Sequence, residues 1–529
     1  MDNSSLKSTK VYWGPLGLIA SFKILIHVTT NLLSEFGLHR DEYLYLSESD
    51  HLAWGYMEVP PAISVIGWLS RGLFGDTLFA VKVFPVLVGV MTIFLLGIFI
   101  KELGGGRSAQ IIGATSFLLS PAFLGSNGLF QPVSFNQFFW FLTAFALLKT
   151  LNYRESNQND SIKHWLALGV IFGLGILTKY SIAFFLIAIF VGMLFTKHRG
   201  VFLTKYSYIA ALIALVIAAP NLWWQYSHDF PIIRHMANLR ATQLVNVTWQ
   251  SYFSSQFIFH LLGSIIWLAG LIYGLRRKAH PTLKMFSIAF LATIVLLFVM
   301  SGKAYYTVGA YTMMFGLGGI ALERWIGQKA LLIIPIMIFI HAFVIPISLP
   351  ILPVKEMETY SKFVQNIFQF VEPFRWEDGE VRTMRQDYAD MLGWDEIPLK
   401  VAEIYHSLSE DEKKNCLIWG GSYGHAGVLN FYREEFELPQ CHSFNASFVA
   451  WVPLDLDIKA QIQVEDSYMD PSPYFEQTIL MDSIENPLAR DPGYIYLKVG
   501  PKEDLRPIWN EIVNEERMAA GYKALPVSD

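Results

Sequence analysis

Residues that could move a proton or bind a metal ion lie in the stretch GLHRDEYLYLSESDHLAWGYMEVPP, from Gly37 to Pro61. Asp41 and Glu42 are adjacent carboxylates, and Glu58 stands two residues before a pair of prolines. A carboxylate that is partly removed from water is a better proton acceptor than one in bulk water, which makes Asp41 a candidate general base. The alternative is that the pair caps a helix, because acidic side chains stabilise the free amide hydrogens of a helix start.

A second group of residues could bind an anion. Lys179 occurs in LTKYS, Lys303 precedes Tyr305 and Tyr306 in SGKAYY, and Arg234 and Arg240 lie in the segment 227–255. A cation at membrane depth costs about 3 kcal/mol unless it has an anionic partner, so these side chains suit a phosphate group. The alternative is that their long side chains reach out to lipid headgroups.

These residues belong to a chain with the composition of a membrane protein. It has 529 residues, of which 53% are apolar and only 16% are charged, more hydrophobic surface than one soluble core could bury. Apolar runs of about 20 residues, long enough to cross a bilayer, recur until Leu349. We expect eleven spans, at residues 11–33, 79–100, 109–126, 133–151, 164–178, 180–196, 207–226, 256–275, 285–301, 304–322 and 330–349.

The sequence changes character after the last span. Residues 355–529 combine frequent charged and polar residues with short apolar segments, which is typical of a water-soluble α/β domain. We therefore predict a mainly α-helical polytopic membrane domain over residues 1–350 and a soluble α/β domain over residues 351–529. The net charge of −5 comes without a basic stripe and gives no indication of a nucleic-acid partner.

The predicted loops differ in charge. With the amino terminus inside, the inner loops contain most of the basic residues: Lys101, Arg107, Arg154, Lys163, Lys197, Arg199, Lys205, Arg276, Arg277, Lys278, Lys284, Arg324 and Lys329. This positive-inside pattern, with an odd number of spans, places the soluble domain outside. In a bacterium that is the periplasmic side of the inner membrane. In a eukaryote it is the endoplasmic-reticulum lumen, where the sequons at Asn246 and Asn445 would be usable.

The first outer loop, residues 34–78, is long enough to contain two amphipathic helices. DEYLYLSESDHLAW and PPAISVIGWLSRGLF have the pattern of helices that lie along a membrane surface, and Pro60-Pro61 separates them. Asp41 and Glu42 then stand at the start of a surface helix.

Four stretches, HRDEYLYLSESDHLAWGYMEVPP, LTKYS, NLWWQYSHDFP and GKAYYTVGAY, resemble the motif series of the family 39 glycosyltransferases. That family includes protein mannosyltransferases and lipid A aminoarabinose transferases. RQDYADMLGW and YGHAGVLNFY resemble a C-terminal domain of its bacterial members. The resemblance implies a GT-C fold and an enzyme that transfers a sugar, with inversion, from a polyprenyl-phosphate donor. The acceptor would be a lipid, glycan or protein at the outer face of the membrane.

The resemblance also implies roles for single residues. Asp41 becomes the catalytic residue, which takes the proton from the acceptor, and Glu42 orients it. The donor phosphate is then bound by Lys179, Arg234, Arg240, Lys303, Tyr305 and Tyr306. The sugar or the acceptor contacts Tyr43, Trp54, Tyr56 and His228, with Tyr45 nearby, although aromatic rings at this depth also form an ordinary interfacial belt.

The chain departs from the family's pattern at two places. Glu58 matches a metal-binding residue in the Glu-Lys-Pro-Pro motif of aminoarabinose transferases, so a divalent metal is the one cofactor that the resemblance implies. Here Val59 replaces the lysine of that motif, which removes one phosphate contact. In QPVSFNQFFW, Val133 and Asn136 stand where relatives often have an acidic residue, which argues against a second catalytic carboxylate.

Two other functions remain open. Gly420 to Gly424 reads G-x-S-x-G, the pattern of a hydrolase nucleophile at Ser422, but too few residues separate Ser422 from His442 for a hydrolase sheet. A flippase or transporter of lipid-linked sugars is the second alternative, although neither internal repeats nor mid-span charges are evident. The two cysteines, Cys416 and Cys441, could form a disulfide.

Overall fold

The computed structural model describes residues 10–484, 486–491 and 493–527. Its contacts divide the chain into two compact units. Unit 1 comprises Met1–Leu33, Lys82–Asn221 and Ala241–Ile351, and unit 2 comprises Ser34–Val81, Leu222–Arg240 and Leu352–Asp529. The sequence places the first outer loop with the membrane domain, whereas in the structure this loop packs with the C-terminal part of the chain.

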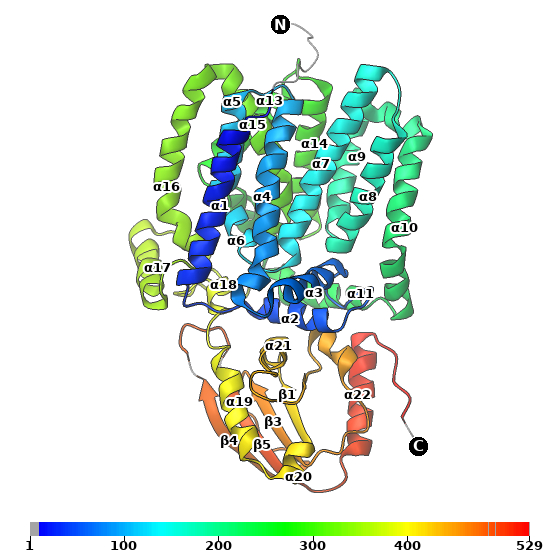
Figure 1. The fold of residues 1–529 in the computed structure, drawn as a ribbon, viewed down its shortest axis with the longest axis vertical. Coiled ribbons are helices and arrows are strands. Elements are labelled where there is room, and N and C mark those ends of the chain that lie inside the picture. The colour runs from blue at the N-terminus through cyan, green and yellow to red at the C-terminus, as the bar shows by residue number, and fades with distance from the viewer. Residues whose placement is uncertain (1–9, 485, 492, 528–529) are drawn as a thin grey trace. The chain divides into compact units, whose positions relative to one another are not determined.

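Unit 1 is built from helices, and Figure 1 shows the long ones running in roughly the same direction. The α-helices are α1 (Trp13–Leu33), α4 (Leu78–Glu102), α5 (Arg107–Leu119), α6 (Pro121–Asn127), α7 (Pro132–Asn157), α8 (Ile162–Thr178), α9 (Ile182–Leu194), α10 (Lys205–Ser227), α12 (Trp249–Ile258), α13 (Gly263–Leu275), α14 (Pro281–Val299), α15 (Tyr311–Ile326) and α16 (Ile333–Ser348). Short 3₁₀ helices are η1 (Lys197–Leu203), η2 (Leu244–Asn246), η3 (Ala304–Ala310) and η4 (Gly327–Leu332).

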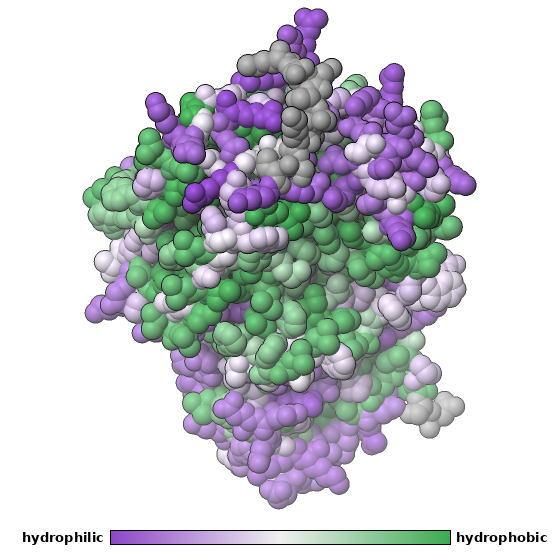
Figure 2. Space-filling view, turned by 45° about the horizontal axis from the view of Figure 1, so that its top comes forward, coloured by the Kyte–Doolittle hydropathy of each residue, from purple (hydrophilic) through white to green (hydrophobic). Residues whose placement is uncertain are grey.

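Small residues let these helices approach closely. A Cβ atom added at Gly318 of α15 would lie 1.9 Å from the carbonyl oxygen of Ile266 in α13, and one at Gly192 of α9 would lie 2.4 Å from that of Met285 in α14. Such contacts replace the hydrophobic driving force that is missing between helices in lipid. Large apolar side chains cover the outer faces of the same unit, with Phe339 82% exposed, and Figure 2 shows this apolar surface in green.

Five helical segments are long and apolar enough to cross a membrane, or up to eight if each bent pair of helices is one span. This range covers the described residues, and the eleven spans expected from the sequence are not confirmed. Bends account for much of the difference: α5 and α6 meet at 62°, α9 and η1 at 113°, and α12 and α13 at 101°. In addition, η3 to α16 count as one segment, Ala304–Ser348, where the sequence suggests two spans.

Unit 2 contains a five-stranded mixed sheet, as expected for a C-terminal α/β domain. The strands are β1 (Cys416–Gly420), β2 (Cys441–His442), β3 (Ala460–Glu465), β4 (Phe475–Ile484) and β5 (Gly493–Pro501), in the order β2-β1-β3-β5-β4. β1 pairs with β2 and β3 in parallel, and β5 pairs with β3 and β4 antiparallel. Cys416 and Cys441 are both free, so the disulfide left open by the sequence is not formed.

Unit 2 also contains helices, two of them in the first outer loop. They are α2 (Arg40–Asp50), α3 (Ala62–Phe74), α11 (Pro231–Thr242), α17 (Val354–Phe368), α18 (Gln386–Ala389), α19 (Glu396–Ser407), α20 (Glu410–Lys414), α21 (Tyr423–Phe431) and α22 (Arg506–Ala520), with 3₁₀ turns η5 (Glu372–Phe374) and η6 (Ala446–Trp451). α22 packs on the sheet through Trp509, which contacts the ring of Trp419 edge to face at 5.7 Å.

The two helices predicted in the first outer loop are present as α2 and α3. α3 keeps an amphipathic pattern, with Trp68, Leu73 and Phe74 exposed and Ile63 buried. α2 is instead buried over most of its surface, because α21 packs against it so closely that a Cβ at Gly427 would lie 2.7 Å from that of Tyr43. The C-terminal part therefore covers the helix that carries Asp41.

Candidate functional site

The start of α2 is capped by two side chains. His39 is the N-cap residue, and its Nδ1 accepts a hydrogen bond from the Asp41 backbone N–H at 3.1 Å. The Glu42 carboxylate reaches back and accepts from the His39 backbone N–H at 2.7 Å, which completes a capping box. The capping role considered for the Asp-Glu pair therefore falls to Glu42, which is fully buried.

Asp41 uses its side chain differently. The Tyr423 hydroxyl at the start of α21 donates a hydrogen bond to Asp41 Oδ1 at 2.6 Å. Arg40 Nε donates to the same hydroxyl at 2.8 Å and lies 3.9 Å from Asp41 Oδ1. The Asp41 side chain remains 32% exposed. A carboxylate that is held in place and still accessible has the geometry that a general base needs.

An ion-pair network fixes the residues behind Asp41. Arg40 Nη1 pairs with Asp491 at 2.8 Å, and His39 Nε2 lies 3.5 Å from Asp390, which is 2% exposed. Burial alone would raise the pKa of Asp390, but His39, Arg40 and Arg490 hold it below its ordinary value. Asp390 therefore carries a charge that keeps the start of α2 in place.

Glu48 and Glu58 form a second carboxyl cluster in unit 2. Ser64 donates to Glu48 at 3.1 Å, and Ser447 of η6 donates to Glu58 at 2.5 Å. Burial raises the pKa of Glu58 to about 7, and burial together with the Glu58 charge raises the pKa of Glu48 well above its ordinary value. Because the Glu58 charge disfavours ionisation of Glu48, whereas a hydrogen bond with Glu48 lowers the pKa of Glu58, Glu48 is the group that keeps its proton at neutral pH.

The Glu58 carboxyl group is engaged in this cluster, and it stays a predicted rather than an observed metal ligand. Among the described residues, no group of three or more His, Cys, Asp or Glu side chains could hold a metal ion. Two carboxyl groups alone do not make the donor set that divalent cations usually take in proteins.

The predicted sugar-binding rings occupy different environments. Tyr43 packs on Trp394 and Phe431, and the Tyr56 hydroxyl donates to the Glu48 carbonyl at 3.0 Å. Both rings are at most 2% exposed, so protein encloses them, and their contact with sugar stays a prediction. Trp54 is 58% exposed.

The remaining candidates of unit 2 belong to its 222–240 segment. His228 stacks on Trp224 at 4.2 Å and meets Tyr522 edge to face. Arg234 donates to the carbonyls of Met518 and Ala519 at 2.5 and 2.9 Å, and thus binds the negative end of α22. Arg240 is exposed near the end of α11.

Four of the predicted phosphate-binding residues come together in unit 1. Lys179, at the end of α8, has its Nζ 5.9 Å and 5.4 Å from the ring centres of Tyr305 and Tyr306. Lys303 precedes η3, lies 6.0 Å from the Tyr305 ring and donates to Gln243 at 2.5 Å. Residues that are 124 positions apart in the sequence thus form one cluster of two ammonium groups and two phenol rings, which we call the lysine–tyrosine cluster.

Gln256 of α12 anchors the 3₁₀ helix on which this cluster depends. Its amide oxygen accepts hydrogen bonds from Thr307 and Tyr311, both at 2.7 Å. Gln256 is 3% exposed. The sequence gives no signal for this residue, because a lone glutamine in an apolar segment reads as part of a span.

Two further residues of the site escape sequence reasoning for a different reason. Tyr423 lies inside the G-x-S-x-G stretch, where attention falls on the serine. Ser422 is the N-cap of α21, and its hydroxyl accepts from the His425 backbone N–H at 3.4 Å, a structural role. Glu48 follows Asp41 by two helical turns on α2, and that spacing was the available signal for it.

Known proteins resemble this chain in sequence and in fold. A family model described as dolichyl-phosphate-mannose-protein mannosyltransferase matches residues 58–224. The lipid A galacturonosyltransferase RgtD of Rhizobium johnstonii is 25% identical over 236 residues, 43% of this chain and 47% of that protein. The undecaprenyl phosphate-alpha-4-amino-4-deoxy-L-arabinose arabinosyl transferase of Aeromonas hydrophila is 26% identical over 233 residues, 42% of this chain and 41% of that protein. This chain therefore spans less than half the length of either relative.

A solved structure covers nearly the whole chain. ArnT from Cupriavidus metallidurans, crystallised with undecaprenyl phosphate, superposes with a TM-score of 0.60 at 15% sequence identity, over 92% of this chain and 98% of ArnT. That likeness shows the fold. Together these comparisons confirm the resemblance to GT-C-fold membrane glycosyltransferases and identify the chain as an integral membrane protein.

Proposed function

We propose that this chain, which resembles the GT-C-fold membrane glycosyltransferases, transfers a sugar from a polyprenyl-phosphate donor to a lipid, glycan or protein acceptor. The observation that carries the proposal is the setting of Asp41, a third-exposed carboxylate that Tyr423 binds at 2.6 Å. The names of the relatives support the donor class, because they include a dolichyl-phosphate-mannose and an undecaprenyl-phosphate-linked sugar transferase.

In the proposed reaction Asp41 accepts the proton of the acceptor hydroxyl or amine. The acceptor atom then forms a bond to the anomeric carbon of the sugar, on the face opposite the phosphate. The bond from that carbon to the phosphate oxygen breaks, and its electron pair leaves with the polyprenyl phosphate. Attack from the opposite face inverts the anomeric centre.

The lysine–tyrosine cluster has the chemistry to bind the phosphate. Ammonium groups make short, charge-assisted hydrogen bonds to phosphate oxygens, and phenol hydroxyls add neutral ones. Lys179 and Lys303 would therefore stabilise the charge that grows on the leaving phosphate. Their cation–π contacts with Tyr305 and Tyr306 hold the two ammonium groups near one another.

We further propose that the protein lies in a bacterial inner membrane with its amino terminus in the cytoplasm and its C-terminal domain in the periplasm. The excess of Lys and Arg in alternate loops supports this orientation. Donor and acceptor would then meet at the outer face of the membrane.

The test is transfer by the purified full-length protein in liposomes, with a labelled polyprenyl-phosphate sugar and extracted membrane lipids and glycans as acceptors. We expect Asp41→Asn to insert and fold like the wild type but to lose transfer by about 10²–10⁴-fold, because the amide is not a proton acceptor. Asp411→Asn, at an exposed position of α20, serves as the control. A fully active Asp41→Asn protein would refute the mechanism, and movement of the labelled lipid across the bilayer without a glycosylated product would favour a flippase.

A further inference from the structure

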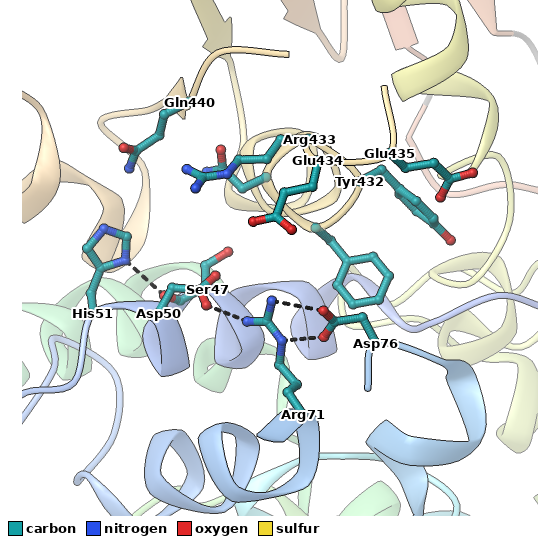
Figure 3. Close-up of a pocket in the computed structure, with 12 residues that line it drawn as sticks. Ser47, Asp50, His51, Arg71, Asp76, Tyr432, Arg433, Glu434, Glu435 and Gln440 are labelled. Carbon is teal, nitrogen blue, oxygen red and sulfur yellow. Dashed lines mark hydrogen bonds and ion pairs between the residues drawn. The ribbon is translucent and has the colours of Figure 1, made fainter. Parts of the chain in front are cut away.

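A pocket of about 530 Å³ lies in unit 2 between the C-terminal end of α2, α3 and the segment that follows α21. Figure 3 shows Ser47, Asp50 and His51 from α2 and its C-terminal end, and Arg433, Glu434 and Gln440 from the segment that faces them. We call this the α2–α21 pocket. Its volume is within the range of about 300–1,000 Å³ that is common for small-molecule sites.

Ion pairs and hydrogen bonds fix the walls of the α2–α21 pocket. Arg71 of α3 pairs with Asp50 at 2.5 Å and also with Asp76, so one guanidinium ties the end of α2 to the loop after α3. Asn430 exchanges two hydrogen bonds with the Cys441 backbone, at 2.9 and 2.8 Å. Because these groups are paired with other protein groups, they fix the shape of the pocket and are not available to bind a ligand.

Among the other lining side chains, the charged and amide groups of Arg433, Glu434, Glu435 and Gln440 make no hydrogen bond or ion pair with any residue that the structure describes. Arg433 offers guanidinium donors, Glu434 offers carboxylate acceptors, and the Gln440 amide offers both. The rings of Phe431 and Tyr432 line the same space. Saccharides have hydroxyl groups that both donate and accept hydrogen bonds, and apolar ring faces that pack on aromatic side chains.

The net charge of the pocket lining indicates which kinds of saccharide the pocket can bind. Asp50, Asp76, Glu434 and Glu435 contribute four carboxylates to the lining, against the two cations Arg71 and Arg433. An excess of negative charge disfavours phosphates and sugar acids by like-charge repulsion. Sugar units without an acidic group remain compatible with this lining, and uncharged ones need no counter-charge from it.

We propose that the α2–α21 pocket binds uncharged sugar units of a glycan-bearing acceptor, a proposal that rests on the proposed glycosyl transfer. α2 connects this pocket to Asp41: Asp41 and Asp50 lie at opposite ends of the helix, about 13 Å apart along its axis. The pocket therefore holds sugar units that do not react, while the reacting group of the same acceptor lies at Asp41.

Saturation-transfer NMR on the full-length protein in a detergent without sugar groups tests this binding directly. The probes are maltotriose, cellotriose and triacetylchitotriose, with inorganic phosphate as the charged comparison. We expect saturation transfer to at least one trisaccharide, unaffected by phosphate. Absence of transfer to all three at millimolar concentration, or displacement of a bound trisaccharide by phosphate, would overturn the proposal.

Two substitutions locate the binding in the pocket. Glu434→Gln and Gln440→Ala should each weaken the trisaccharide roughly tenfold, as expected for the loss of a hydrogen bond to a ligand hydroxyl. Glu437→Gln, an exposed position of the same segment that does not line the pocket, should leave binding unchanged. Full binding by both pocket variants contradicts the assignment. Because binding is read without turnover, it also separates this proposal from a failure of the transfer assay.

Discussion

Asp41 and Tyr423 make the contact through which the C-terminal part of the chain reaches the proposed general base. The Tyr423 hydroxyl donates to Asp41 at 2.6 Å and also accepts a hydrogen bond from Arg40. Because Tyr423 begins α21, the position of α21 determines how this hydrogen bond orients the carboxylate. We expect Tyr423→Phe to lower kcat by roughly tenfold or more with little change in the donor KM, because a charge-assisted hydrogen bond orients the base and does not bind the donor. Tyr405→Phe, in the same unit, is the control. A change confined to KM would contradict the positioning role.

The Glu48–Glu58 cluster predicts that the free energy of unfolding depends on pH. Below about pH 4.5 Glu58 is protonated in both the folded and the unfolded chain. As the pH rises, the unfolded chain releases the proton first and the folded one only near pH 7, so stability falls across this window and then levels off. The full loss is on the order of 3 kcal/mol.

Glu58→Gln removes this titration. We expect the variant to lose less thermal stability than the wild type between about pH 5 and about pH 8, and Glu48→Gln to act in the same direction. Glu410→Gln, which is 92% exposed, should behave like the wild type. Identical slopes in all four proteins, measured by thermal unfolding in one detergent, would show that Glu58 does not titrate in this range.

At the scale of elements, η3 contributes Tyr305 and Tyr306 to the lysine–tyrosine cluster, and Gln256 of α12 binds η3 through Thr307. Gln256→Leu fits the buried space but leaves the Tyr311 hydroxyl without its acceptor and Thr307 with the Ala304 carbonyl as its remaining one, which costs about 1–3 kcal/mol locally. We expect a higher KM for the polyprenyl-phosphate donor, while acceptor binding to unit 2 is unchanged. Gln328→Leu, on the exposed η4, is the control. An unaltered donor KM would mean that η3 keeps its place without Gln256.

The elements also show how far the sequence could be interpreted. The spacing of DEYLYLSESDH and the prolines after Val59 predict two helices in the first outer loop, and α2 and α3 confirm both. Burial of α2 could not be predicted, because it depends on α21, which lies nearly 400 positions away and approaches through Gly427. The count of eleven spans is not confirmed for a related reason: composition shows where the chain is apolar, but not where a helix bends by 101° within an apolar segment.

The candidate site likewise divides into residues that the sequence predicts and residues that only tertiary contacts reveal. The family resemblance groups six residues as phosphate-binding: Lys179, Arg234, Arg240, Lys303, Tyr305 and Tyr306. The structure brings Lys179, Lys303, Tyr305 and Tyr306 together, whereas Arg234 lies at the end of α22. Glu48, Gln256 and Tyr423 were missed, because their roles come from tertiary contacts with no local pattern. Residues that belong to a recognisable motif can be predicted from a sequence, whereas the residues that orient them can be identified only from the folded structure.

For the whole molecule, contacts within unit 1 bear on the orientation in the membrane. Glu102 pairs with Lys149, Glu155 pairs with Lys197 and lies near His280, and Glu323 accepts hydrogen bonds from the backbone of Gly106 and Ala109. These contacts gather the ends of α4, α7, α14 and α15 beside the loops that are rich in Lys and Arg. Since such loops stay in the cytoplasm, this end of unit 1 should face inward.

With the odd number of spans that the sequence predicts, we expect the chain to end on the opposite side. We expect a reporter that is active only in the cytoplasm to be silent when fused after residue 529 and active when fused in the loop between α13 and α14, which contains Arg276, Arg277 and Lys278. The loop fusion is the control for expression and insertion. A reporter that works only outside the cytoplasm should give the reverse pattern. Strong cytoplasmic activity after residue 529 would place Asp41 and its partners in unit 2 on the wrong side for the proposed transfer, because unit 2 contains both α2 and the C-terminal domain.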